Sequence, residues 1–345
     1  AESSIDVLPR PLEAFLLFTA GPTGCRGELE LELATADKTW TAKAPVEAPR
    51  FGHRLVKVRE VFPDLPAAAT GVLKVRQPAQ PMFYGRMFCG HLDAQGRFTA
   101  NHSYYDSSAT AEYWDDRRDS YRSYPFFPGL DNRVRMYPIM SPGELAVTVS
   151  LHGAGGKKLA NVPAGVVTSP GPRFLDVSVG ALAEGAGLAV TAVEAFTLST
   201  ACGSGRMPTR VNHQLVHSSG GLESSVNVSL VNPNVFLPPG KTGMTWGQFP
   251  AGKGITSYLG FVGNAPEGKP EPLEVTFYGE GGEIGRFEKV LSPGGSVRFN
   301  SKDFEVPGEL PAYLWFMARS PRPDLTAIVA TRDDATGACT GEHGF

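Results

Sequence analysis

The sequence predicts an all-β protein built from three tandem, related antiparallel β-sandwich-like domains. Apolar and polar residues alternate with a period of two over many short segments, which is typical of half-buried strands. Glycine (40 residues) and proline (29) are abundant but not periodic, which fits a chain with many turns. No segment carries a convincing 3.6-residue period, so we expect no helix longer than two turns.

The composition limits the classes of partner. With 345 residues, 41% of them hydrophobic, the chain can bury two or three cores. A net charge of -3 gives no electrostatic support for binding nucleic acid or an anionic membrane. No apolar stretch approaches ~20 residues, so we expect no membrane span. The oligomeric state stays open.

Each copy of the repeat opens with two alternating strands separated by a Gly/Pro turn. These pairs are expected at 14–18 and 28–33, at 134–139 and 145–151, and at 258–262 and 273–278. A third strand follows a second turn, and a fourth follows a short apolar segment. Third strands are expected at 54–58, 174–179 and 296–299, and fourth strands at 72–75, 188–193 and 313–316. Four or more short strands per ~100 residues predict a small antiparallel sandwich.

The repeat predicts sandwich domains at 1–106, 133–217 and 257–345. Between them lie an aromatic and Pro-rich connection at 107–132 and a Gly/Pro-rich connection at 218–256. Connections of this length in a compact protein are usually functional or cover a sheet edge. Three such copies could be arranged with pseudo-threefold symmetry.

Each copy closes on a histidine at the same relative place: His102, His213 and His343. Three imidazoles that converge near a pseudo-threefold axis would form a mononuclear metal site. Neutral imidazole is the commonest metal ligand, and three of them with an open position suit one transition-metal ion, Fe, Cu or Zn. The alternative is that the repeated motif only ends a strand, with Asn in a turn and His capping carbonyls.

The first two closing segments also match after the histidine. His217 follows His213 at the spacing at which Asp106 follows His102, and Glu112 and Glu223 recur later. His217 is therefore a candidate fourth metal ligand. An open metal position could activate a bound water. The candidate catalytic residues beside it are Tyr105, Asp106 and Glu112.

The first residues and the cysteines indicate an exported protein. Ala1-Glu2-Ser3-Ser4 lacks an initiator Met and resembles the end left by signal cleavage. Four cysteines without CxxC spacing suggest one or two disulfides, at Cys25, Cys89, Cys202 and Cys339. The expected location is periplasmic or extracellular.

Together these observations favour an exported metalloprotein, with an oxygen-activating or hydrolytic enzyme as the leading interpretation. Its substrate would be a small molecule or a glycan. The sequence contains no GxSxG, P-loop, HExxH or helix-opening GxGxxG motif that would indicate another catalytic class. The alternative is a non-catalytic tandem β-sandwich protein that binds a glycan or a protein and whose histidines are structural.

Overall fold

The computed structural model describes residues 2–35, 37–79, 87–105, 114–115, 119–136, 144–167, 175–203, 207–208, 210–231, 242–264, 268–304 and 313–344. These residues form antiparallel sheets with two short helices, which confirms the predicted all-β fold class. The chain divides into two compact units. The first comprises Ala1–Trp114, Met136–Glu144 and Val167–Leu175, and the second comprises Asp115–Arg135, Leu145–Val166 and Asp176–Phe345. No helix in the described part is long and apolar enough to cross a membrane.

Three sets of eight strands share one topology. When the strands are numbered one to eight within each set, strands 4, 3, 6 and 1 form one sheet and strands 5, 2, 7 and 8 form the other. We call these the 4-3-6-1 sheet and the 5-2-7-8 sheet of each sandwich. A short helical segment follows the fifth strand in every set. The internal repeat predicted from the sequence is therefore present in the topology.

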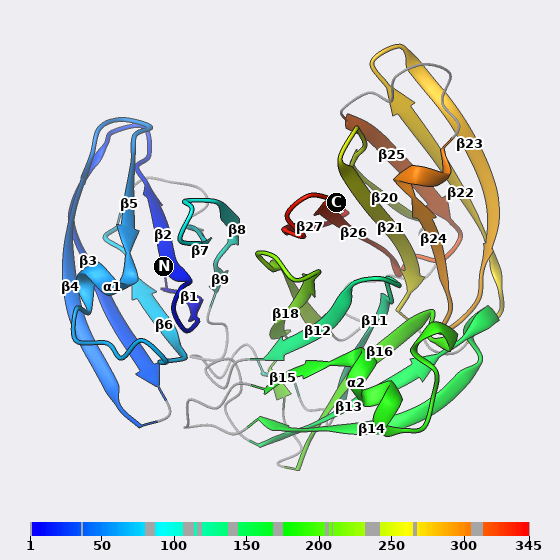
Figure 1. Cartoon of the computed structure of the whole chain (residues 1–345), viewed down its shortest axis with the longest axis horizontal. Helices are drawn as coiled ribbons and strands as arrows, with labels where there is room; N and C mark the ends of the chain where they lie inside the picture. Colours follow the sequence, from blue (N-terminus) through cyan, green and yellow to red (C-terminus); the bar gives the residue numbers. More distant parts are fainter. Residues whose placement is uncertain are drawn as a thin grey trace. The chain divides into compact units, whose positions relative to one another are not determined.

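The first sandwich lies in the first unit and is drawn in blue and cyan in Figure 1. Its strands are β1 (Glu2–Val7), β2 (Glu13–Thr19), β3 (Cys25–Thr35), β4 (Thr39–Ala48), β5 (His53–Lys57), β6 (Gly71–Arg76), β7 (Phe88–Leu92) and β8 (Phe98–His102). Helix α1 (Val58–Val61) follows β5, and β9 (Tyr104–Tyr105) extends one sheet beside β1. Leu29, Leu31 and Leu33 of β3 share one core with Leu16 and Phe18 of β2, because alternate residues of a strand face the same side.

The second sandwich lies in the second unit. Its strands are β11 (Asp119–Pro125), β12 (Asp131–Met136), β13 (Leu145–His152), β14 (Lys158–Val167), β15 (Leu175–Ser178), β16 (Ala195–Cys202), β18 (Arg210–Ser218) and β19 (Ser224–Val231). Helix α2 (Val179–Gly185) follows β15, and two-residue strands occur at β10 (Trp114–Asp115) and β17 (Met207–Pro208). The pair Tyr121 and Val231 joins β11 to β19 and makes the two sheets continuous. The strand predicted at 188–193 starts later, because 3-10 turn η4 (Val190–Ala192) precedes it.

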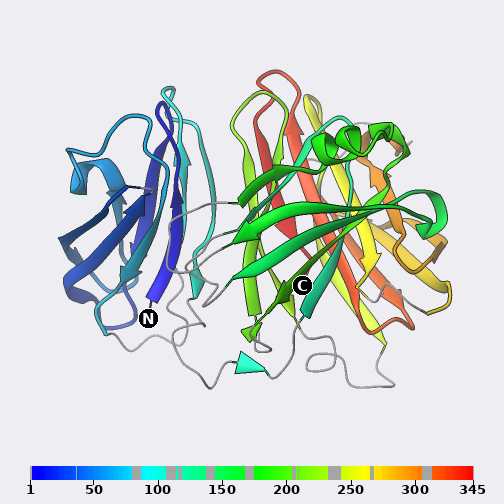
Figure 2. The same cartoon turned by 90° about the horizontal axis from the view of Figure 1, so that it is seen from below.

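The third sandwich, drawn from yellow to red in Figures 1 and 2, also lies in the second unit. Its strands are β20 (Gly243–Pro250), β21 (Ile255–Gly263), β22 (Glu271–Gly279), β23 (Gly282–Leu291), β24 (Ser296–Asn300), β25 (Tyr313–Ser320), β26 (Leu325–Asp333) and β27 (Cys339–His343). The 3-10 turn η5 (Ser301–Asp303) follows β24. Its core is rich in phenylalanine, with Phe249, Phe277 and Phe316 fully buried and each packed edge to face on a neighbouring phenylalanine.

Both ranges expected to be connections contain strands. The range 107–132 holds β11 and the start of β12, and the range 218–256 holds β19 and β20. These are mainly first and eighth strands of their sets. The sequence pattern identified the second, third and fifth strands of every copy, and also most of the sixth.

One sheet of the third sandwich packs against the second sandwich. Tyr258 on the outer face of β21 lies 5.7 Å from the ring of Phe127, measured between centroids. A Cβ atom on Gly260 of the same strand would overlap Pro125, so the two backbones approach closely. The 5-2-7-8 sheet of the third sandwich is therefore covered on both faces, and its 4-3-6-1 sheet carries the exposed face.

Candidate functional site

His102 and His343 occupy equivalent positions, since each is the last residue of the eighth strand of its set. In both, the backbone N–H of the histidine donates to the side chain of the preceding residue, Asn101 Oδ1 at 2.7 Å and Glu342 Oε1 at 3.0 Å. In both, the ring Nδ1 lies beside the carbonyl oxygen of the following residue, at 3.2 and 3.1 Å. A carbonyl only accepts, so Nδ1 carries the hydrogen and the neutral ring holds its lone pair on Nε2. The two closing segments share one local structure.

His213 lies on β18, the seventh strand of its set, and is not equivalent to the other two. It is fully buried, with Nε2 2.7 Å from the Tyr124 hydroxyl and Nδ1 3.3 Å from the Val211 carbonyl. Nδ1 therefore donates to Val211, and the Tyr124 hydroxyl donates to Nε2. Burial lowers the pKa of His213 to about 3, so its ring is neutral near pH 7. Both ring nitrogens are engaged inside the sandwich, as expected for a core histidine.

His217 lies on the same inward face of β18 as His213 and is also buried. Its ring centroid is 5.4 Å from that of Phe127. Burial lowers the pKa of His217 to about 4. Its Nδ1 has no hydrogen-bond partner among the described residues. His217 is thus a neutral core residue packed on an aromatic ring.

The remaining predicted site residues are not brought together by the described part of the chain. Asp106 and Glu112 lie outside the described residues, and only the backbone of Tyr105 is described, as part of β9. The described residues contain no group of three or more His, Cys, Asp or Glu side chains that could hold a metal ion. The three-histidine site with Fe, Cu or Zn stays a prediction. Elemental analysis tests it, since one metal ion per chain that is lost in His343→Ala would support it.

The expected disulfides are absent, and that expectation was wrong. Cys25, Cys89, Cys202 and Cys339 are all free. In the first sandwich, Cys25 and Cys89 belong to strands of different sheets, β3 and β7. Burial raises the pKa of Cys89, and it raises the pKa of Cys339 to about 11, so both thiols are protonated near pH 7. These buried thiols behave as small apolar side chains.

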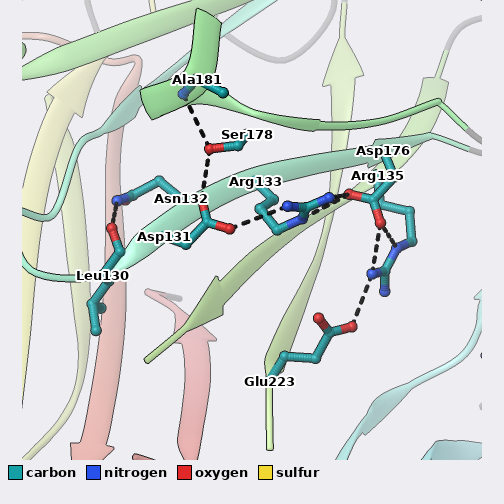
Figure 3. Close-up of polar contacts among 9 residues, drawn as sticks. All are labelled: Leu130, Asp131, Asn132, Arg133, Arg135, Asp176, Ser178, Ala181 and Glu223. Carbon is teal, nitrogen blue, oxygen red and sulfur yellow. Dashed lines mark hydrogen bonds and ion pairs between the residues drawn. The ribbon is translucent and has the colours of Figure 1, made fainter. Parts of the chain in front are cut away.

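A compact group of charges lies around β12 of the second sandwich (Figure 3). Arg133 and Arg135 both bind the carboxylate of Asp176 on β15, at 2.9 and 2.8 Å. Arg133 also pairs with Asp131 at 3.1 Å, and Arg135 pairs with Glu223 at 2.8 Å. Glu223 is the recurring acid of the sequence motif, and its partner here is an arginine. Every carboxylate in the group faces a guanidinium, so the group holds strands together instead of presenting an open charge.

The same group also fixes the start of α2. Ser178 donates to Asp131 Oδ1 at 2.6 Å and accepts the backbone N–H of Ala181 at 3.3 Å. Ser178 is thus the N-cap of α2, which satisfies one of the helix's unpaired N–H groups. We therefore assign a structural role to this group, linking β12, β15, α2 and the turn between β18 and β19.

Large aromatic side chains are exposed on the outer face of the 4-3-6-1 sheet of the third sandwich. On β20 and β25 the inward residues are buried, whereas Trp246, Tyr313 and Trp315 point outward and are 45%, 59% and 44% exposed. Tyr278 of β22 is directly opposite Trp315 and lies on the same face. We call these four residues the aromatic face. Contiguous exposed apolar groups make this face a candidate binding site.

The aromatic face is interleaved with flexible and polar side chains. Gln248 lies opposite Trp315 on β20, and Met317 lies opposite Trp246. Arg319 is exposed at the end of the row formed by Trp315 and Met317, opposite Glu274 of β22. A ligand on this face would meet ring surfaces together with hydrogen-bonding groups.

Charged residues lie beside the aromatic face on β23. Arg286 binds Glu283 at 2.9 Å and Glu274 of β22 at 3.8 Å, and its bond with Glu283 raises the pKa of Arg286. Glu288 lies directly opposite Glu274 and has no ion-pair partner among the described residues. Carboxylates thus outnumber guanidinium groups along this edge. We call Glu274, Glu283, Arg286 and Glu288 the acidic rim.

The aromatic face was not recognised from the sequence, although part of β25 was predicted. The segment 313–318 reads Tyr-Leu-Trp-Phe-Met-Ala, which is apolar in both strand phases. A strand of that kind is usually buried on both faces. The available signal was the division of residue types, with Tyr, Trp and Met in one phase and Leu, Phe and Ala in the other. Only the sheet order shows that the first phase faces outward.

No family model matches the chain, and no curated protein matches it. Among solved structures, it is similar to the M60 catalytic domain with the CBM51-1 and CBM51-2 domains of ZmpB from Clostridium perfringens, at 8% identity and a TM-score of 0.18. That alignment covers 91% of this chain and 54% of the other, so this chain spans about half its length. A tetra-tandem repeat in the extending region of a large adhesion protein aligns at 8% identity and a TM-score of 0.14, covering 94% and 67%. Scores this low carry no argument about function.

Proposed function

We propose that the chain is a non-catalytic glycan-binding protein that holds its ligand on the aromatic face of the third sandwich. The observation that carries the proposal is the outward exposure of Trp246, Tyr313 and Trp315 on a sheet whose inward residues already form a complete core. These three rings are not part of the core that holds the third sandwich together. Burying them against a ligand would remove apolar area from water.

The chemistry of the face suits a glycan and is less suited to a nucleic acid. A sugar ring has C–H faces that stack on aromatic rings and hydroxyl groups at its edge that form hydrogen bonds. Gln248 and Arg319 supply polar groups next to the rings. A single-stranded nucleic acid would also stack, but it needs a positively charged groove. Protein interfaces are also enriched in Trp, Tyr, Met and Arg, so protein binding is the competing outcome of the test.

A glycan ligand also agrees with the expected periplasmic or extracellular location, which remains a proposal. In this interpretation His213 and His217 are structural, because both are neutral core side chains. The leading metalloenzyme interpretation from the sequence has no support from the described contacts.

The test is glycan binding by the full chain and by Trp315→Ala, measured on a glycan array and then by calorimetry. Loss of one stacking ring should weaken binding at least about fivefold, since ring stacking is worth roughly 1–3 kcal/mol. Val290→Ala is the matched control, because Val290 is exposed on β23 of the same sheet but away from the rings. Binding that is unchanged in Trp315→Ala would exclude this face as the site.

A further inference from the structure

We infer that the ligand of the aromatic face is an uncharged glycan chain that lies across the strands, an inference that rests on the proposed function. It names the class of glycan and the direction in which it binds. Two independent features carry it: the positions of the rings on three neighbouring strands, and the charges of the acidic rim.

The rings are distributed across the sheet more than along it. Tyr278 of β22 and Trp315 of β25 form one cross-strand pair. Trp246 of β20 lies one strand further and is diagonal to Trp315, because its direct partner is Met317. Neighbouring strands are about 4.8 Å apart, so Tyr278 and Trp246 are separated sideways by roughly 10 Å. A chain that crosses the strands therefore meets Tyr278, Trp315 and Trp246 in turn.

A chain that ran along the strands would meet fewer rings. On β25 only Tyr313 and Trp315 point outward as aromatic residues, and the next outward positions are Met317 and Arg319. On β20 the outward residues on either side of Trp246 are Met244 and Gln248. The crossing direction thus offers three rings on three strands, against two rings on one strand.

The acidic rim indicates that the ligand carries no negative charge. A chain that crosses from Trp246 to Tyr278 continues over β23, where Glu283 is opposite Tyr278. The rim holds three carboxylates and one guanidinium, and Arg286 is already paired with Glu283 and Glu274. With Arg319 opposite Glu274 included, carboxylates still outnumber guanidinium groups by three to two. A sulfated or uronic acid glycan would meet repulsion there, which penalises it relative to a neutral glycan.

The second carboxylate of β23, Glu288, lies further from this path. It is directly opposite Glu274, which is four residues along β22 from Tyr278. The carboxylate closest to the crossing chain is therefore Glu283.

The direction is tested by calorimetric titration of the full chain with neutral oligosaccharides of one to six units. We expect affinity to rise until the chain can reach all three rings. Trp246→Ala and Tyr278→Ala should each weaken binding of the longest oligosaccharide about tenfold, and Tyr313→Ala, which removes the one ring of the aromatic face outside the row, should weaken it less than either. A larger effect of Tyr313→Ala would overturn the crossing direction. Circular dichroism and thermal unfolding show which variants are folded.

The charge is tested by comparing neutral and uronic acid oligosaccharides of equal length. The full chain should prefer the neutral ligand, and Glu283→Gln, which removes the carboxylate opposite Tyr278, should raise affinity for the acidic ligand several-fold and change affinity for the neutral one less. Tighter binding of the acidic ligand, still lost in Trp315→Ala, would overturn this inference and leave the proposed function standing. Binding of no glycan at all would overturn the proposed function and this inference with it.

Discussion

The 4-3-6-1 sheets of the first and third sandwiches have the same strand order, but the side chains on their outer faces differ in chemistry. In the first sandwich charged side chains predominate at the outward positions of β3, β4 and β6, and Lys43 pairs with Glu28 and Arg76 with Glu30, each at 3.1 Å. Glu30, Lys43 and Arg76 line a shallow hollow of about 470 Å³. In the third sandwich the corresponding face carries Trp246, Trp315 and their neighbours.

The difference shows that this topology accepts outward residues of very different chemistry as long as the inward residues are apolar. Leu31 of β3 and Phe316 of β25 are both buried in apolar cores, and each alternates with an outward residue of different chemistry. The outward positions are therefore free to take on function. One face is a solvated lattice of ion pairs, and the other is an exposed row of rings.

The largest expected effect concerns the inward residues that the two sheets have in common. Phe316→Ala should lower the free energy of unfolding by about 3–5 kcal/mol and Leu31→Ala by about 2–5 kcal/mol, because each leaves a cavity in a closed core. The outward Glu30→Ala should stay within about 0.5 kcal/mol. Urea unfolding measures all three. Similar losses for Glu30→Ala and Leu31→Ala would contradict the assignment of inward and outward positions.

The second prediction separates the two outer faces by function. The double variant Trp246→Ala/Trp315→Ala should weaken glycan binding about 25-fold or more, since each ring contributes at least about fivefold. Removing charges from the first sandwich with Lys43→Ala/Arg76→Ala should leave glycan affinity unchanged. Calorimetry on both double variants checks this. Equal losses in the two would show that binding does not depend on the aromatic face.

The second sandwich extends the comparison, because its core contains titratable groups. His213 and His217 have pKa values of about 3 and about 4 when folded, against about 6.5 when unfolded. The unfolded chain therefore binds more protons below pH 6.5, and stability that is complete above that pH is lost as the pH falls toward 4. Each group should contribute about 2–3 kcal/mol of this loss. Urea unfolding from pH 7 to pH 4 measures it.

His217→Phe is the variant that isolates one of these groups. The ring of His217 already packs on Phe127, so a phenyl ring should be accommodated there. We expect a shallower fall of stability with acid in this variant, with His213 still contributing. The same slope as in the parent chain would mean that His217 is not buried in its neutral form.

The smallest expected effect is that of the exposed ion pairs of the first sandwich. Glu28→Gln or Glu30→Gln should change the free energy of unfolding by no more than about 1 kcal/mol, and less at high salt, because the partners are exposed to water. Denaturant unfolding at low and high ionic strength measures this. A salt-independent loss of several kcal/mol would show that these pairs are structural.

The fold class and the repeat could be predicted from the sequence because apolar residues at every second position of a strand face the core. Leu29, Leu31 and Leu33 alternate with glutamates, and this pattern alone predicts β3. First strands such as β11 were missed because aromatic and charged residues obscure the alternation between Asp119 and Pro125.

The site was harder to predict from the sequence than the fold, because it depended on the strand in which each histidine lies. His102 and His343 were matched correctly as equivalent positions. His213 also follows an asparagine, but it lies on a seventh strand, where its ring points into the core. Strand order is a long-range property that short motifs do not encode. The aromatic face was hidden for the same reason, since exposure of Trp315 depends on what covers β25.

Tryptophan fluorescence of the full chain during titration with a neutral oligosaccharide tests the central claim most directly. Two of the four tryptophans, Trp246 and Trp315, belong to the aromatic face. We predict a saturable change in emission that persists in Trp40→Phe, which alters a tryptophan of the first sandwich, and disappears in Trp246→Ala/Trp315→Ala. A saturable change that survives in the double variant would contradict the assignment of glycan binding to this face.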